Sequence, residues 1–126
     1  MSDELQRWAD TYAEALRAGD AEAAANLFAE DCVFRSHPFR ELEDAREYTR
    51  RVFGSERERD VWFGTAVGSG SRGAVEYWAA MVEDDRDVTL AGCCVIELDP
   101  DGRCRKLRDY WAMQPGRTGP PAGWGG

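Results

Sequence analysis

Three residues of this chain are of types that transfer protons, and each stands in a different predicted element. Tyr12 lies in the first stretch with helical periodicity, His37 directly precedes Pro38, and Asp109 lies near the end of the last extended stretch. A phenol, an imidazole and a carboxyl that meet in one apolar interior can hold, donate and accept a proton. The sequence therefore predicts a small-molecule pocket, with these three side chains as its candidate catalytic groups.

Each of these residues also has a structural interpretation, and the sequence leaves both interpretations open. A core tyrosine such as Tyr12 commonly donates its hydroxyl hydrogen to a backbone carbonyl. His37 is the single histidine of the chain; it titrates near neutrality, but a lone histidine also serves to buttress a turn. Asp109 would be structural if it paired with an arginine or with His37, because such a partner offsets the cost of burying a carboxylate.

The composition indicates one globular domain and excludes two classes of partner. A chain of 126 residues with 43% hydrophobic content can bury a core without disulfides. With 24 acidic against 16 basic residues and a net charge of -8, it lacks the basic stripe that nucleic acids and anionic membranes require. The mixed run Glu56-Arg57-Glu58-Arg59-Asp60 nearly neutralises itself and is interpreted as a solvated turn.

Targeting and metal-binding patterns are missing from the sequence. The first four residues, Met1-Ser2-Asp3-Glu4, contain no basic segment followed by an apolar one, and no run of about 18 apolar residues is long enough to span a bilayer. We therefore expect a cytoplasmic protein. Its cysteines have no spacing typical of zinc sites and are interpreted as reduced thiols; they are Cys32, Cys93, Cys94 and Cys104. We expect no metal and no cofactor.

Apolar spacing predicts three helices in the first half of the chain. Residues 4–17 carry one apolar stripe at i, i+3 and i+4 spacing. Asp20 is typical of a helix N-cap, and the second helix is expected to bury Ala23, Leu27 and Phe28. A third helix is predicted over residues 42–53. Its buried side is expected to comprise Leu42, Ala45, Tyr48 or Thr49, and Val52.

After Gly54 the periodicity changes from helical to extended. Four segments rich in Val, Trp, Tyr, Thr and Leu, separated by Gly and Asp turns, are predicted as strands in meander order. Helices followed by strands are typical of an α+β fold, with the helices packed on one face of an antiparallel sheet. We predict one domain over residues 1–114 and a Gly/Pro-rich tail over residues 115–126, which Trp124 pins to the body. The predicted strands are residues 61–67, 73–84, 87–98 and 103–114, with a short extended piece at residues 32–34.

Both faces of the predicted sheet are apolar, so both need cover. One face meets the helices. The other face, with Trp78, Val95 and Tyr110, predicts a homodimer interface, since monomers rarely expose so large an apolar patch. The alternative is that the tail or a helix covers this outer face within one chain.

The chain resembles the nuclear transport factor 2-like superfamily, and within it the SnoaL-like polyketide cyclases and ketosteroid isomerases. This resemblance implies a cone-shaped α+β fold with three N-terminal helices packed on a curved antiparallel sheet. It implies less about function, because the scaffold hosts isomerases, cyclases, hydrolases, dehydratases and proteins without catalysis. The resemblance spans about residues 4–114 and is carried by Trp8 to Asp20, Leu27-Phe28-Ala29-Glu30-Asp31-Cys32-Val33-Phe34, Ser36-His37-Pro38-Phe39, Asp101-Gly102 and Arg108-Asp109-Tyr110-Trp111.

The resemblance also implies roles for individual residues. Tyr12 stands eight residues before Asp20, where steroid isomerases place the tyrosine that stabilises the oxyanion. Their general-base position falls at His37, or at Ser36 with a different gap. Their protonated aspartic acid falls near Cys94, a weak donor. SnoaL-like cyclases and limonene epoxide hydrolases place a proton-transferring aspartate in the last strand, where this chain has Asp109.

The resemblance and strand alternation together predict a ligand pocket, and two classes of function remain open. The first is a cofactor-independent isomerase, cyclase or hydrolase that transfers a proton on a hydrophobic carbonyl compound. The alternative is a non-catalytic binding module for a small hydrophobic ligand, whose polar groups only orient it. The expected lining residues are Trp8, Phe34, Tyr77, Cys94 and Trp111.

Overall fold

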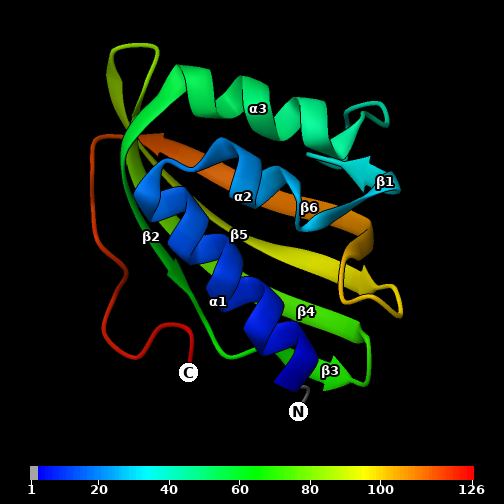
Figure 1. Ribbon diagram of the computed structural model, residues 1–126. Coiled ribbons are helices and arrows are strands. Elements are labelled where there is room, and N and C mark those ends of the chain that lie inside the picture. The colour runs from blue at the N-terminus through cyan, green and yellow to red at the C-terminus, as the bar shows by residue number, and fades with distance from the viewer. Residues whose placement is uncertain (1–2) are drawn as a thin grey trace.

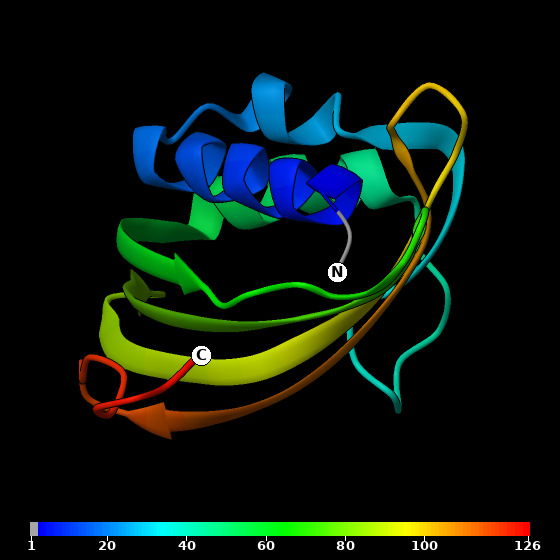
Figure 2. The same cartoon turned by 90° about the horizontal axis from the view of Figure 1, so that it is seen from below.

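The computed structural model describes residues 3–126 and places the helices on one face of a curved sheet (Figure 1). Within those residues the helices are α1 (Asp3–Ala18), α2 (Ala21–Ala25) and α3 (Ala45–Ser55). The sheet curls beneath them as a half-barrel (Figure 2). The predicted α+β arrangement is confirmed, with α2 much shorter than the other two helices. No helix in residues 3–126 is long and apolar enough to cross a membrane.

One continuous sheet contains all the strands of the described chain. Its order is β1-β6-β5-β4-β2, and β3 pairs with the N-terminal end of β4, beyond the residues that pair with β2. The central pairs β4/β5 and β5/β6 are antiparallel, as the meander predicts. The strands are β1 (Phe28–Arg35), β2 (Glu56–Phe63), β3 (Val67–Ser69), β4 (Arg72–Glu83), β5 (Arg86–Leu98) and β6 (Cys104–Pro115).

The prediction of a wholly antiparallel sheet was wrong at one edge. β1 runs parallel to β6, with Phe34 opposite Leu107, so the sheet is mixed. The sequence showed only a short extended piece here, because Glu30 and Asp31 interrupt the apolar pattern between Phe28 and the second half of the strand. A parallel edge pair joins segments far apart in the chain, and local periodicity does not report such pairing.

Helix boundaries also differ from the predictions. The side chain of Asp20 accepts a hydrogen bond from Ala23 N at 3.0 Å, as expected of an N-cap. The helix ends at Ala25, however, so Phe28 is buried as the first residue of β1 rather than as part of α2. The third helix begins after Asp44, whose side chain accepts from Glu47 N at 2.9 Å. Leu42 therefore precedes the helix and is 55% exposed.

Aromatic side chains between α1 and β1 fill one half of the interior. Trp8, Tyr12 and Phe28 contact one another edge to face, with ring centroids 5.1 to 5.7 Å apart. In the middle of β5, Gly92 lets the backbone of β6 approach closely, because a Cβ there would lie 2.7 Å from Trp111 Cβ. A glycine at such a close approach is typical of a bending strand. The candidate site lies over the inner face of the same sheet.

The C-terminal tail packs across the outer face of the sheet. Trp78 Nε1 donates to Thr118 O at 2.7 Å, and its ring meets Trp124 edge to face at 6.1 Å. Further along, Thr65 N donates to Gly125 O at 2.8 Å. The tail therefore covers the Trp78 end of this face within one chain. At that end the structure agrees with the alternative interpretation, in which the tail rather than a second subunit covers the sheet.

A homodimer through the rest of the outer face stays a prediction. Tyr110 is 40% exposed on β6 and Val95 is partly buried beside it on β5. A dimer seated on these residues would lose its apolar contact if a charge were placed at its centre. We expect the wild-type protein to sediment as a dimer and Tyr110→Glu as a monomer. A wild-type monomer, or a dimer that Tyr110→Glu leaves intact, would contradict the predicted interface.

Candidate functional site

A cavity of about 340 Å³ lies between α1, α3 and the inner face of the curved sheet. Its middle section is apolar, formed by Leu16, Val61, Ala79, Met81 and Leu90. Polar side chains stand at its two ends. The volume is within the range of small-molecule sites, which are typically apolar hollows with a few placed polar groups.

Asp109 provides the carboxyl at one end of the cavity. In the register of β5 and β6 it stands opposite Cys94, so both side chains point to the inner face. Tyr77 donates its hydroxyl hydrogen to Asp109 Oδ1 at 2.8 Å, and Cys94 Sγ lies 3.7 Å from the same oxygen. Burial raises the pKa of Asp109 to about 7, although these hydrogen bonds and the charge of Arg40 act to lower it. Near neutral pH, Asp109 therefore exists in both acid and base forms.

The groups that contact Asp109 remain protonated donors. Burial and the neighbouring carboxyl raise the pKa of Tyr77 and of the Cys94 thiol well above their ordinary values. Neither group therefore competes with Asp109 for the role of a base near neutrality. The sequence predicted both residues as cavity lining, and their inward orientation follows from strand alternation.

Tyr12 reaches the same end of the cavity from α1. Its ring packs on Trp8 and Phe28, and burial, with Cys94 and Asp109 nearby, raises the pKa of its phenol. No side chain or carbonyl of the described residues accepts a hydrogen bond from its hydroxyl. The Tyr12 hydroxyl is thus a donor available to a ligand oxygen beside Asp109.

The structure does not bring His37 into this cavity. His37 lies in the loop after β1, where its Nδ1 accepts from Phe39 N at 3.3 Å. Its ring meets Trp111 at 4.9 Å, and His37 is not among the residues that line the cavity. Trp111 itself lines the cavity, and its Nε1 donates to Ser36 O at 2.6 Å. The loop position therefore assigns His37 to the support of Trp111, and the expected three-residue convergence is reduced to Tyr12 and Asp109.

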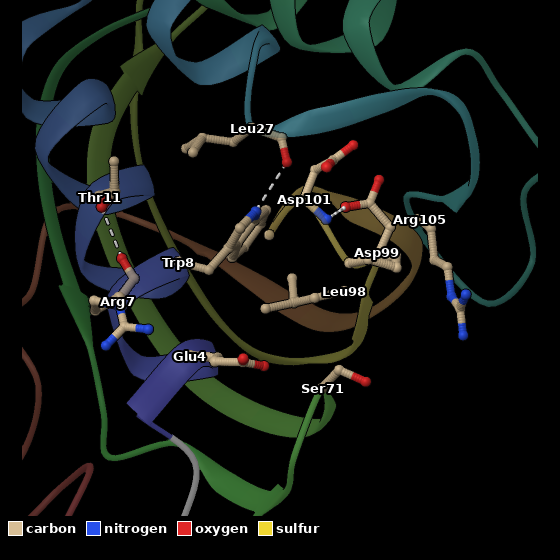
Figure 3. A pocket seen from close by; sticks show the side chains of 12 residues that line it. Glu4, Arg7, Trp8, Thr11, Leu27, Ser71, Leu98, Asp99, Asp101 and Arg105 are labelled. Carbon is tan, nitrogen blue, oxygen red and sulfur yellow. Dashed lines mark hydrogen bonds between the residues drawn. The ribbon is translucent and has the colours of Figure 1, made fainter.

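Two expected lining residues also lie elsewhere. Phe34 is 4% exposed and belongs to the core between Phe28 and Tyr48. Trp8 donates to Leu27 O at 2.9 Å and faces a second hollow on the other side of α1 (Figure 3). That hollow is larger, about 720 Å³. Its walls include the exposed side chains of Glu4, Arg7, Asp101 and Arg105.

Sequence reasoning missed a charged group at the far end of the cavity. The run interpreted as a solvated turn opens β2, and its Glu56 and Arg59 side chains are only 13% and 7% exposed. Both line the cavity together with Glu83 of β4. A register irregularity between Arg57 and Asp60 turns two residues three positions apart to the same face, which simple alternation does not reveal.

Comparison with known proteins identifies the family to which this chain belongs. Residues 9–107 match the family model described as a SnoaL-like domain. The chain belongs to the SnoaL-like domain family. The resemblance to the nuclear transport factor 2-like superfamily is thereby confirmed. No curated protein matches the chain.

Two solved structures are similar to this SnoaL-like protein. The first is SalBIII, described as an epoxide hydrolase/cyclase-like enzyme with a role in pyran ring formation in the polyether salinomycin. It superposes with a TM-score of 0.77 at 21% sequence identity, and the match covers 91% of this chain and 99% of SalBIII. An M. tuberculosis epoxide hydrolase of the LEH-like type gives a TM-score of 0.71 at 24% identity, over 86% and 83%. At these identities the likeness establishes the shared fold.

Removing the Tyr77 hydroxyl should raise the pKa of Asp109 further. The hydrogen bond from Tyr77 stabilises the carboxylate, and a hydrogen bond to a charged group is worth enough to move a pKa by about one unit. We expect an NMR titration of the Asp109 carboxyl to show this rise in Tyr77→Phe. Tyr48→Phe, in the same cavity, is the matched control. An Asp109 pKa that is equal or lower in Tyr77→Phe would contradict the assigned contact.

Proposed function

We propose that this protein is a cofactor-independent enzyme in which Asp109 transfers a proton to or from a hydrophobic substrate held in the cavity. The observation that carries the proposal is a carboxyl in an apolar cavity, hydrogen-bonded to Tyr77, with its pKa raised by burial to about 7. A group whose pKa matches the operating pH is the most effective general acid or base. Buried carboxyls with raised pKa values are concentrated at functional sites.

The leading reaction class is isomerisation or cyclisation of a carbonyl compound. As a carboxylate, Asp109 removes a proton from the carbon next to the carbonyl, and the electron pair of that bond forms the enolate. The Tyr12 hydroxyl, which has no acceptor among the described residues, donates to the enolate oxygen. Asp109, now a carboxylic acid, returns the proton to carbon at the new position. No group is consumed, so no cofactor is required.

Epoxide opening is the second reaction class, and the two similar structures are the reason to include it. Here the acid form of Asp109 gives its proton to the epoxide oxygen as the carbon–oxygen bond breaks. Water, or a hydroxyl of the same substrate, attacks the carbon and returns a proton to Asp109. Both classes use one residue, but they start from opposite protonation states.

A two-part substrate panel tests the proposal. Cyclic ketones are followed by exchange of their α-protons in heavy water, and hydrophobic epoxides, with and without an internal hydroxyl, by their products. We expect turnover of one class, lost in Asp109→Asn and kept in Asp101→Asn, which changes an exposed carboxyl of the β5–β6 turn. Recovery of every bound probe unchanged would support the non-catalytic binding module instead.

The pH profile then identifies the starting form of Asp109. A reaction that begins with the carboxylate should accelerate as pH rises through about 7, because deprotonation supplies the base. A reaction that begins with the acid should slow over the same range. A rate independent of pH between about 5 and 9 would contradict a role for Asp109 in either direction.

A further inference from the structure

Glu56, Arg59 and Glu83 form a charged group at the end of the cavity away from Asp109. Glu56 and Glu83 are directly opposite each other in the antiparallel pair β2/β4, and all three side chains line the cavity. Two carboxylates in that position repel each other unless they share a proton or a cation balances them. Burial and the contact with Glu83 raise the pKa of Glu56 to about 7, and Arg59 acts to lower it.

Arg59 is held in place but is not saturated with hydrogen bonds. Its Nη2 donates to Phe53 O at 3.2 Å, at the end of α3, and its guanidinium lies over the Phe53 ring at 4.5 Å. Its side chain is 7% exposed, and Nε is a buried nitrogen without a hydrogen-bond partner among the described residues. The nearest carboxylate oxygen, Glu56 Oε1, is 3.7 Å away, which is beyond hydrogen-bond distance. A buried donor of the described chain thus lacks a hydrogen-bond partner at this end, with a carboxylate close to it.

The chemistry of this end favours an uncharged hydroxyl. A hydroxyl can accept from an arginine N–H while it donates to a carboxylate oxygen, whereas a carbonyl can only accept. An anionic ligand would meet Glu56 and Glu83, and a cationic ligand would meet Arg59. When the two carboxyls share one proton, they carry a single negative charge, which the guanidinium of Arg59 balances. A neutral group can then bind without leaving a net charge buried.

The apolar middle section separates this end from Asp109. On β4, Tyr77 marks the Asp109 end and Glu83 stands six residues further along, a backbone rise of at most about 20 Å. The carboxyls of Asp109 and Glu56 are closer across the concave face, since Tyr12 and Tyr48 each interact electrostatically with both. Ala79 and Met81 face the cavity between them. A ligand that uses both ends must therefore be elongated, with an apolar body between two oxygen functions.

We propose that Glu56, Glu83 and Arg59 form a second polar subsite that binds a distal hydroxyl group of an elongated, uncharged ligand whose reactive carbonyl or epoxide lies at Asp109. The placement of the reactive group rests on the proposed function. The distal subsite itself rests on the geometry of β2 and β4. The ionised carboxylate of the Glu56–Glu83 pair accepts the hydroxyl hydrogen, and Arg59 donates to the hydroxyl oxygen.

Matched pairs of ligands test the subsite by binding alone, independently of turnover. The probes are 2-alkanones of about eight to fourteen carbons, shorter than the rise of β4, each with and without a terminal hydroxyl, and calorimetry measures their affinities. In the wild-type protein we expect the hydroxyl to increase affinity by about tenfold at the chain length that fits. Glu56→Gln and Glu83→Gln should each lose most of this gain. Glu76→Gln, exposed on the outer face of β4, should keep it.

The outcomes separate this proposal from the proposed function. A hydroxyl that gives no gain at any chain length, or a gain that survives both Glu56→Gln and Glu83→Gln in folded protein, would overturn the distal subsite while leaving the role of Asp109 untouched. A hydroxyl gain in the wild-type protein, together with no turnover of any probe by the wild-type protein, would support the subsite and count against the catalytic proposal. Thermal melting of each variant shows that it is folded before its affinities are compared.

Discussion

Replacing Asp109 by asparagine should make the protein more stable than wild type at about pH 8, with little difference at about pH 4. The pKa of Asp109 is about 7 in the folded protein, against 3.8 for an unperturbed aspartate. Between these values the folded state keeps a proton that the unfolded chain releases. The stability that Asp109 contributes is therefore fully present below pH 3.8 and is lost as pH rises through about 7. Asparagine does not ionise, so the variant avoids this loss.

The size of the effect follows from the pKa difference. About three units at about 1.4 kcal/mol each set an upper bound of about 4 kcal/mol, and the lost contact with Tyr77 reduces it. Urea denaturation of wild type and Asp109→Asn at about pH 4 and pH 8 measures the change, and Glu56, which titrates in the same range, cancels in the comparison. Asp101→Asn is the control. An equal stability difference at both pH values would mean that folding does not raise the pKa of Asp109.

Turnover should fall by roughly 100-fold or more in Asp109→Asn, since general acid–base groups typically contribute that much. Asparagine keeps the size and shape of the side chain but carries no transferable proton. Tyr12→Phe should cost a comparable factor in a reaction that forms an enolate, because it removes a donor to the developing oxyanion. Both are measured as kcat/KM with the substrate found in the panel.

A binding module would respond differently to the same two substitutions. Each would change ligand affinity by only about 1 to 2 kcal/mol, the usual worth of a hydrogen bond, with no rate to lower. A rate that falls less than tenfold in Asp109→Asn would also contradict the assigned role of the carboxyl. Tyr48→Phe, in the same cavity, separates the loss of a specific hydroxyl from a general change in packing.

Local patterns predicted the part of the site that lies on regular strands. Alternation alone turned Tyr77, Cys94 and Asp109 toward the helices, and the antiparallel register of β5 and β6 then set Cys94 opposite Asp109. A strand keeps a fixed period of two, so one correctly placed residue determines the orientation of its neighbours. The residues at the Asp109 end of the cavity could therefore be predicted from the sequence, although the hydrogen bond from Tyr77 to Asp109 was not predicted.

Irregular backbone explains what the sequence did not predict. His37 follows β1 in a loop, where no period determines its direction, and it does not line the cavity. Glu56 and Arg59 were hidden because a local irregularity in β2 breaks alternation. The sequence predicted that Trp124 pins the tail to the body, but the tail has no periodicity that could identify Trp78 as the contact. Such contacts depend on tertiary packing between distant segments, which short-range patterns do not encode.

A titration of the Asp109 carboxyl tests the central claim most directly, because it requires no substrate. Carbon-13 NMR of the wild-type protein resolves the side-chain carboxyls, and the signal that is missing in Asp109→Asn identifies the one of interest. The account predicts that this carboxyl titrates near pH 7, as its burial and its contact with Tyr77 require. A carboxyl that is already fully ionised at about pH 5 would contradict the account, since such a group is a poor proton donor near neutrality.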